Sequence, residues 1–318
     1  FVFADINGNG RYDESEPSTT TDGNGRYTLP TGSAGYEIIV QTDENTIDTS
    51  SGTVLDGLTL KAPSGASVVS PLTTLISESG LSSSQLTMAL KLPSGVNPLS
   101  FDPFAASSNA QTALAVEKVN VQLVATLSAF ASAAEGAGAT EEEAFEAALS
   151  ALTSVVQAKQ SMGSQLDLTN AADLSAVQTA FTSASASLNG IDTAALNRIA
   201  SDVTTAVKNV NTEVASLSNT NLDDQSNINT FGLIGVLKEQ TEAAGRAESE
   251  NAGSGSIDFT DPNKVDGEAA NAAPSAISLS SSTFAEGASS LVIGKLSATD
   301  DSTSGTGFTY EIAQIAGT

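Results

Sequence analysis

Residues 192–217 read DTAALNRIASDVTTAVKNVNTEVASL, and this stretch decides the fold class of the middle of the chain. Its apolar residues recur at spacings of three and four over several turns, which places them on one face of a helix. They are Leu196, Ile199, Val203, Val207, Val210, Val214 and Leu217. Asp192 stands before the stripe in the position of an N-cap residue. The stretch therefore predicts a long amphipathic helix.

Three further stripes with the same period lie elsewhere in the Ala-rich and Leu-rich middle of the chain. Their members are Val116, Val119, Leu123, Leu127 and Phe130, then Phe145, Leu149, Leu152 and Val156, then Leu174, Val177, Phe181 and Leu188. Ser70-Pro71 and Thr140 with Glu143 have the form of helix starts. Four amphipathic helices predict an all-α helical bundle over residues 68–250.

The two ends of the chain have a different composition. Residues 1–62 are rich in Gly, Thr, Asp and Tyr, with short β-branched runs between turn residues. Residues 251–273 lack a period and suggest a linker, and a second β pattern fills residues 274–318. The predicted fold class is therefore multidomain α+β, with a partial N-terminal β-sandwich, the helical bundle, and the start of a C-terminal β-sandwich. We expect the chain to be a piece of a longer polypeptide.

Charge and composition exclude several classes of function. The 318 residues carry 12 Lys+Arg against 37 Asp+Glu, a net charge of −25, with no His and no Cys. There is accordingly no disulfide, no thiolate nucleophile, no Ser-His-Asp triad and no His-ligated or Cys-ligated zinc. The negative charge argues against nucleic acid as a partner, and no run is apolar enough to predict membrane insertion. Hard cations, above all Ca²⁺, are the expected counter-ions.

The segment Asp5-Ile6-Asn7-Gly8-Asn9-Gly10-Arg11-Tyr12-Asp13-Glu14-Ser15-Glu16 fits a twelve-residue calcium loop. Oxygen-bearing side chains occupy loop positions 1, 3, 5, 9 and 12, a backbone carbonyl is offered at position 7, and glycine occupies position 6. In that order these residues are Asp5, Asn7, Asn9, Asp13 and Glu16, with Arg11 and Gly10. Calcium takes six to eight oxygens, which a tight loop supplies by aiming alternate side chains inward.

The alternative interpretation of this segment is an Asn-Gly-rich hairpin whose carboxylates are only solvated. The flanks also differ from those of an EF-hand, because Phe1-Val2-Phe3 suggests a strand and Pro17 is followed by Ser and Thr. We therefore expect the loop to staple a β-domain with an affinity of about 10⁻⁴ to 10⁻³ M. Removal of calcium should loosen this β-domain without unfolding the helices.

Residues 2–17, together with the following run Thr20-Thr21-Asp22-Gly23-Asn24-Gly25-Arg26-Tyr27-Thr28-Leu29, resemble the B-type repeat of serine-aspartate-repeat adhesins. That resemblance implies a calcium-stabilised β-sandwich of a cell-surface stalk. It carries the metal residues over to Asp5, Asn7, Asn9, Asp13 and Glu16, and it adds Asp22 as an extra ligand.

Two other stretches resemble parts of large bacterial surface proteins. Asn271-Ala272-Ala273-Pro274-Ser275-Ala276-Ile277 is similar to the entry of a bacterial cadherin-like repeat, and Phe284-Ala285-Glu286-Gly287 and Leu296-Ser297-Ala298-Thr299-Asp300-Asp301 to its acidic positions. By that analogy Glu286 and Asp300 are further calcium ligands. The run Ser70-Pro71-Leu72-Thr73-Thr74-Leu75 resembles the start of a helical segment of very large secreted surface proteins.

Together these features favour a non-catalytic, calcium-stabilised structural segment of a secreted bacterial cell-surface adhesin. The expected location is extracellular, at the cell surface. The expected partners are calcium and a cell-surface glycan or protein bound through modules outside this segment. Two alternatives remain open. Paired carboxylates suffice for a polysaccharide-active enzyme without His, but the acidic residues at 141–143 and 146 lie where they favour the dipole of a helix. The run Phe231-Gly232-Leu233-Ile234-Gly235-Val236-Leu237 permits close helix approach, which favours a buried packing helix over a partner-binding module.

Overall fold

The stretch quoted first forms helix α6 (Thr193–Ser216) in the computed structural model, which describes residues 1–271, 275–279 and 296–299. Leu196, Ile199, Val203 and Val207 are each at most 2% exposed, so the apolar stripe is the buried face of the helix. The Asp192 carboxylate caps the helix, because its Oδ1 accepts the backbone N–H groups of Ala194 and Ala195.

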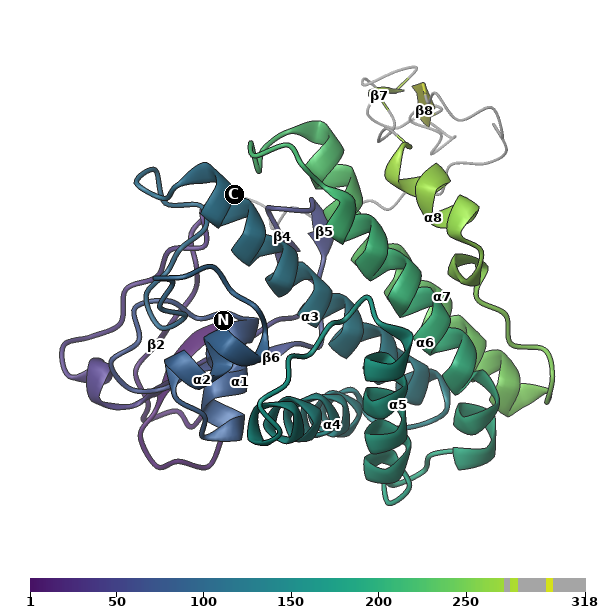
Figure 1. Ribbon diagram of the computed structural model, residues 1–318, viewed down its shortest axis with the longest axis horizontal. Coiled ribbons are helices and arrows are strands. Elements are labelled where there is room, and N and C mark those ends of the chain that lie inside the picture. Colours follow the sequence, from purple (N-terminus) through teal and green to yellow (C-terminus); the bar gives the residue numbers. More distant parts are fainter. Residues whose placement is uncertain (272–274, 280–295, 300–318) are drawn as a thin grey trace, which may run out of the picture. The chain divides into compact units, whose positions relative to one another are not determined.

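Helices make up most of the described chain, about 53% against 7% strand. The first seven α-helices are α1 (Pro71–Ser79), α2 (Ser83–Ala89), α3 (Ala110–Gly136), α4 (Glu141–Ser161), α5 (Ala171–Ser185), α6 and α7 (Gln225–Glu250). In Figure 1 α3 and α7 run side by side through the centre of the first unit, with α4, α5 and α6 packed around them. One apolar core therefore extends through all of these helices.

Two glycines allow α3 and α7 to approach each other closely. A Cβ atom at Gly136 would lie 2.0 Å from the Glu242 carbonyl oxygen, and one at Gly245 would lie 2.4 Å from the Ala133 carbonyl oxygen. Any side chain at either position would force the two backbones apart. These glycines thus serve the packing of two helices.

Helix α3 is also the one helix of the described residues that is long and apolar enough to cross a membrane. Its most apolar 18-residue window has a mean hydropathy of 1.2, and 78% of that window is buried inside the protein. That burial is typical of the core helix of a globular domain.

The N-terminal strands form one small antiparallel sheet in the order β2-β1-β3-β6. These strands are β1 (Val2–Asp5), β2 (Ser18–Thr19), β3 (Glu37–Gln41) and β6 (Thr59–Ala62). The register sets Val2 opposite Val40 and Ile38 opposite Ala62. On one face Val2, Ala4, Ile38 and Ala62 form a separate small apolar cluster.

A helix closes the β6 edge of this sheet. The Lys61 backbone N–H donates to Thr74 Oγ1 at 2.9 Å, and Thr73 Oγ1 donates to the Lys61 carbonyl oxygen at 2.7 Å. Ser70 caps α1 in a capping box whose second member is Thr73. Side chains at the start of α1 thus satisfy the backbone groups that an edge strand leaves unpaired.

The predicted fold class was wrong. No second sheet faces β2-β1-β3-β6 within the described residues, so the expected N-terminal β-sandwich is absent and the fold is built mainly of helix. The physical reason is that these strands have only two to five residues, which is too little apolar surface for a sandwich core. Residues 1–269 form one compact unit in which the sheet packs on α1.

A two-stranded ribbon, β4 (Ile47–Asp48) with β5 (Thr53–Val54), lies against α7. Ideal Cβ atoms at Gly232 and Gly235 would lie 3.4 to 3.6 Å from Ser51 and Thr53 atoms. The glycine-containing run in residues 231–237 therefore packs inside the molecule, with Phe231 and Leu237 each 0% exposed.

The segment after α7, which the sequence suggested as a linker, contains a 3₁₀-helix η2 (Asp258–Thr260) and α8 (Pro262–Ala269). Phe259 and Val265 are buried, and Asn209 donates from its amide nitrogen to the Phe259 and Thr260 carbonyl oxygens at 2.9 and 3.1 Å. Another 3₁₀-helix, η1 (Ser33–Gly35), precedes β3.

The second unit, residues 270–318, has one described pair of strands. In it β7 (Ser275–Leu279) pairs antiparallel with β8 (Leu296–Thr299). The expected start of a C-terminal β-sandwich rests mostly on residues outside those that the structure describes.

Candidate metal site

The loop of residues 5–16 connects β1 to β2 and is closed at its base by the sheet. The Ala4 N–H donates to the Pro17 carbonyl oxygen at 3.0 Å, which holds the two ends of the loop together. Within the loop the chain turns at Gly8 and Gly10, whose φ angles are 73° and 75°. Glycine adopts this left-handed conformation without steric cost.

Asp5 holds the first half of the loop from inside. Asp5 is only 5% exposed. Oδ1 accepts the N–H groups of Gly8 at 2.7 Å and Asn9 at 3.2 Å, and Oδ2 accepts that of Gly10 at 2.8 Å. One carboxylate therefore satisfies three backbone donors of the loop.

At the other end of the loop, the Glu16 carboxylate also accepts hydrogen bonds from backbone N–H groups. The residue is 6% exposed. Its Oε1 accepts the Ile6 N–H at 2.8 Å and its Oε2 accepts the Asp13 N–H at 3.1 Å. Loop positions 1 and 12 thus point inward, and both are hydrogen-bonded to the loop backbone.

Asn7, Asn9 and Asp13 gather on the solvent side of the loop. The amide nitrogens of Asn7 and Asn9 both donate to Asp13 Oδ2, at 2.6 and 3.0 Å. Their amide oxygens accept the N–H groups of Asn9 and Arg11 at 2.9 and 2.8 Å. The three side chains that the sequence assigned to loop positions 3, 5 and 9 are therefore neighbours.

The fit of this loop to calcium is partial. Its donors are the hard oxygens that calcium prefers. However, amide nitrogens instead of amide oxygens face Asp13, and no group of three or more Asp, Glu, His or Cys side chains gathers closely enough to hold a metal ion in the described part of the chain. Rotation of the Asn7 and Asn9 amides would exchange nitrogen for oxygen within the same shape, at the loss of the hydrogen bonds that their oxygens accept.

Arg11 and Asp22 lie apart from this group. The Arg11 guanidinium points outward and donates to Glu142 Oε1 at 2.9 Å, in the first turn of α4. Asp22 forms its own turn, in which Oδ1 accepts the N–H groups of Asn24 and Arg26 at 2.8 and 2.9 Å. The hydrogen bonds from Arg26 and Asn24 lower the pKa of Asp22 below its usual value. Among the described residues, no hydrogen bond or ion pair joins Asp22 to residues 5–16.

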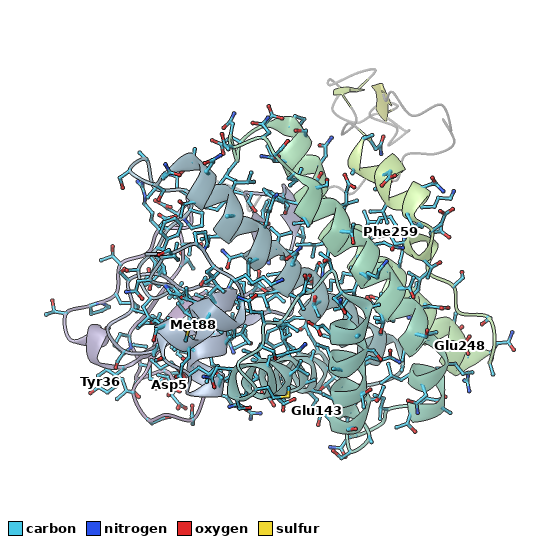
Figure 2. The ribbon with its side chains drawn as sticks, in the orientation of Figure 1. Asp5, Tyr36, Met88, Glu143, Glu248 and Phe259 are labelled. Carbon is cyan, nitrogen blue, oxygen red and sulfur yellow. The ribbon has the colours of Figure 1, made fainter. Side chains whose placement is uncertain are left out.

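The two candidate ligands near the C-terminus, Glu286 and Asp300, lie outside the residues that the structure describes. The acidic residues considered for glycoside hydrolysis lie at the start of α4. Glu142 pairs with Arg11, and Glu143 accepts hydrogen bonds from Thr140 Oγ1 at 3.1 Å and Asn189 Nδ2 at 3.2 Å. Figure 2 labels Asp5 and Glu143 in their places on the fold.

Two carboxyl groups that sequence reasoning missed are held in α3. Burial raises the pKa of Glu117 to about 7, against a hydrogen bond from Asn120, and the charges of Asp48 and Asp102 raise it further. Burial also raises the pKa of Glu135 to about 7. The sequence pattern does indicate the burial of Glu117, because this residue lies about one helical turn from the apolar residues Leu114 and Val121 and so shares their face of the helix.

Comparison of the chain with protein-family models, curated proteins and solved structures gave no match.

Proposed function

We propose that this chain is a calcium-stabilised, non-catalytic structural segment of a secreted bacterial cell-surface adhesin, with Ca²⁺ held in the loop of residues 5–16. The observation that carries the proposal is the register of five oxygen-bearing side chains and Gly10 in a twelve-residue loop. The net charge of −25 is consistent with an environment that contains hard cations such as Ca²⁺.

A cation bound in this loop would hold β1 and β2 together. The loop joins β1 to β2, and its two inward carboxylates are already fixed by backbone N–H groups at 2.7 to 3.2 Å. A cation there would offset the negative charges of the loop carboxylates Asp5, Asp13 and Glu16. Its binding energy would add to the stability of the folded state alone.

Calorimetric titration of Ca²⁺ into the chelator-stripped protein tests the proposal. Asp13→Asn is the informative variant, because Asp13 is exposed and accepts only the two Asn amides with its side chain. We expect it to weaken calcium binding at least tenfold. Asp43→Asn is the matched control, since Asp43 is an exposed turn residue whose Oδ1 accepts the Asn45 N–H at 2.9 Å.

A second variant checks the role given to loop position 7. Arg11→Ala keeps the backbone carbonyl and removes only the guanidinium, so calcium binding should survive. No heat of binding at millimolar Ca²⁺, or binding that is unchanged in Asp13→Asn, would refute a calcium site in this loop.

A further inference from the structure

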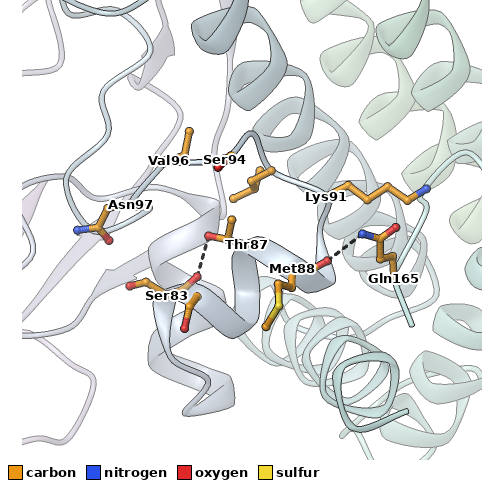
Figure 3. A pocket seen from close by; sticks show the side chains of 11 residues that line it. Ser83, Thr87, Met88, Lys91, Ser94, Val96, Asn97 and Gln165 are labelled. Carbon is orange, nitrogen blue, oxygen red and sulfur yellow. Dashed lines mark hydrogen bonds between the residues drawn. The ribbon is translucent and has the colours of Figure 1, made fainter. Parts of the chain in front are cut away.

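A surface cavity of about 590 Å³, widely open to solvent, lies between α2, the turn that follows it and Gln165 (Figure 3). This volume lies in the range of pockets that take small organic ligands, about 300–1,000 Å³. The cavity lies outside the candidate metal site, because none of its lining residues belongs to the loop of residues 5–16.

An unusual backbone conformation forms one wall of this cavity. Lys91 has φ 55°, and it is the one residue other than glycine with a positive φ among those the structure describes. The turn is fixed by a hydrogen bond from the Leu92 N–H to the Thr87 carbonyl oxygen at 3.0 Å. Lys91 follows Leu90, the C-cap residue of α2, and a left-handed residue at that position is a common way for a helix to end. This end of α2 therefore gives the wall a defined backbone shape.

A distant segment fixes the rim. Gln165 donates from Nε2 to the Met88 carbonyl oxygen at 3.3 Å, and the Leu166 N–H donates to the Ala89 carbonyl oxygen at 2.8 Å. These two bonds tie the connection between α4 and α5 to the end of α2. The cavity is thus formed by elements that are already held together, which lowers the entropy cost of binding a ligand.

The polar groups of the lining suit a ligand with many hydroxyl groups. Ser83 and Ser94 line the cavity, and their hydroxyls make no hydrogen bond to other described residues, whereas the hydroxyl of the lining residue Ser84 lies 3.1 Å from that of Ser82. Asn97 uses only its oxygen, to accept the Leu99 N–H at 3.3 Å, and Gln165 uses only its nitrogen. Hydroxyl, amide N–H and amide oxygen groups are therefore all available to donate and accept hydrogen bonds.

The charge of the lining favours an uncharged ligand. No carboxylate lines the cavity, although the chain has 37 acidic residues. Lys91 is the one ionisable lining residue, and in Figure 3 its side chain extends away from Ser83 and Asn97. Its ammonium group pairs with Asp167 at 3.2 Å, which neutralises it.

Apolar groups complete the lining. Leu92 and Val96 are 7% and 8% exposed, and Met88 is 61% exposed at the rim. Such groups can contact the C–H face of a sugar ring. No aromatic ring lines the cavity, so the dissociation constant should be in the millimolar range, about 1 mM or weaker.

We propose that this cavity is a binding site for an uncharged saccharide unit, held by hydrogen bonds from Ser83, Ser94, Asn97 and Gln165. The proposal is independent of calcium, and its test uses the whole chain.

Saturation-transfer NMR with three neutral probes, methyl β-glucoside, methyl β-galactoside and methyl α-mannoside, tests it, with galacturonate as a charged probe. We expect transfer to at least one neutral glycoside. The double variant Ser83→Ala with Asn97→Ala should reduce that transfer severalfold, and Ser94→Tyr, which fills the cavity, should abolish it. Ser100→Ala is the matched control, because Ser100 is exposed in the same loop but does not line the cavity.

The outcomes separate clearly. Transfer to a neutral glycoside that both cavity variants reduce and Ser100→Ala retains would support the site. Transfer to galacturonate alone would overturn the uncharged ligand, and transfer that survives both cavity variants would place binding elsewhere. No transfer to any probe at millimolar concentration would overturn the proposal. Unchanged thermal unfolding of the variants shows that a loss is not caused by misfolding.

Discussion

The loop of residues 5–16 and the crossing of α3 with α7 are stabilised in opposite ways. In the loop, side-chain oxygens from Asp5 and Glu16 reach backbone N–H groups at most ten residues away. At the crossing, Gly136 and Gly245 bring two backbones together because they have no side chain. Local polar chemistry thus shapes the first region, and long-range close packing shapes the second.

The largest change in the free energy of unfolding is expected from a substitution at the crossing of α3 and α7. Gly245→Ala would place its Cβ 2.4 Å from the Ala133 carbonyl oxygen, so the helices must separate. We expect the free energy of unfolding to fall by about 2–3 kcal/mol, measured by urea denaturation. Gly267→Ala in α8 is the control, because nothing lies within 4 Å of that position. It should be neutral or stabilising by up to about 1 kcal/mol. Equal effects of the two substitutions would contradict the close approach.

The next largest change in the free energy of unfolding is expected from the addition or removal of calcium. At about one hundred times its dissociation constant, a ligand that binds only the folded state adds about 2.7 kcal/mol. Because the sheet and the helices belong to one unit, calcium should raise the midpoint of a single thermal transition. Scanning calorimetry with and without chelator measures this. Two separate transitions would restore the sequence-based expectation that the β-region loosens alone.

A change of pH is expected to alter the free energy of unfolding by a comparable amount, through the ionisation of Glu117. Burial raises the pKa of Glu117 to about 7 from 4.5, so the folded state holds this proton more tightly than the unfolded chain. The unfolding free energy contributed by Glu117 is therefore greatest below pH 4.5, falls as the pH rises to about 7, and stays low above it. Glu117→Gln should stabilise the protein by about 1–3 kcal/mol at pH about 8.

Urea denaturation of wild type and Glu117→Gln at acidic and alkaline pH checks this prediction. The difference should nearly vanish below pH 4.5, where Glu117 is neutral in both states. A difference that does not change with pH would show that the substitution acts through packing. Glu146→Gln, an exposed position in α4, is the control.

The smallest change in the free energy of unfolding is expected from the ion pair between the loop and helix α4. Arg11 and Glu142 join the loop to α4 at 2.9 Å, but their side chains are 72% and 59% exposed. Exposed pairs contribute about 0–1 kcal/mol. A double-mutant cycle of Arg11→Ala and Glu142→Ala should give a coupling energy below about 0.5 kcal/mol. A larger value would mean that the loop and the helices are coupled through this pair.

The local features of the fold were predictable from the sequence. The stripe in residues 196–214 is the buried face of α6, and Ser70, Thr140 and Asp192 are N-cap residues. These features depend on residues within a few positions of one another, so the pattern contains the required information. The inward orientation of Asp5 and Glu16 was predictable for the same reason.

The prediction of a β-sandwich was wrong because the sequence pattern indicates strands but does not indicate which element packs against them. The hydroxyls of Thr73 and Thr74 at the start of α1 bond the backbone of Lys61, and no local pattern indicates that a helix would take this place. Burial raises the pKa of Glu117, and the charges of Asp48 and Asp102 in distant segments raise it further, so this raised pKa also required the folded chain.

The helical periods, the helix caps and the turn residues of the loop follow directly from the amino-acid pattern, because each depends on interactions between near neighbours. Three features instead required the folded chain: the crossing of α7 and α3 at Gly136 and Gly245, the four-stranded sheet next to α1 in place of a sandwich, and the open cavity between α2 and Gln165. Each of these depends on contacts between segments far apart in the chain, where the fit of surfaces outweighs local propensity.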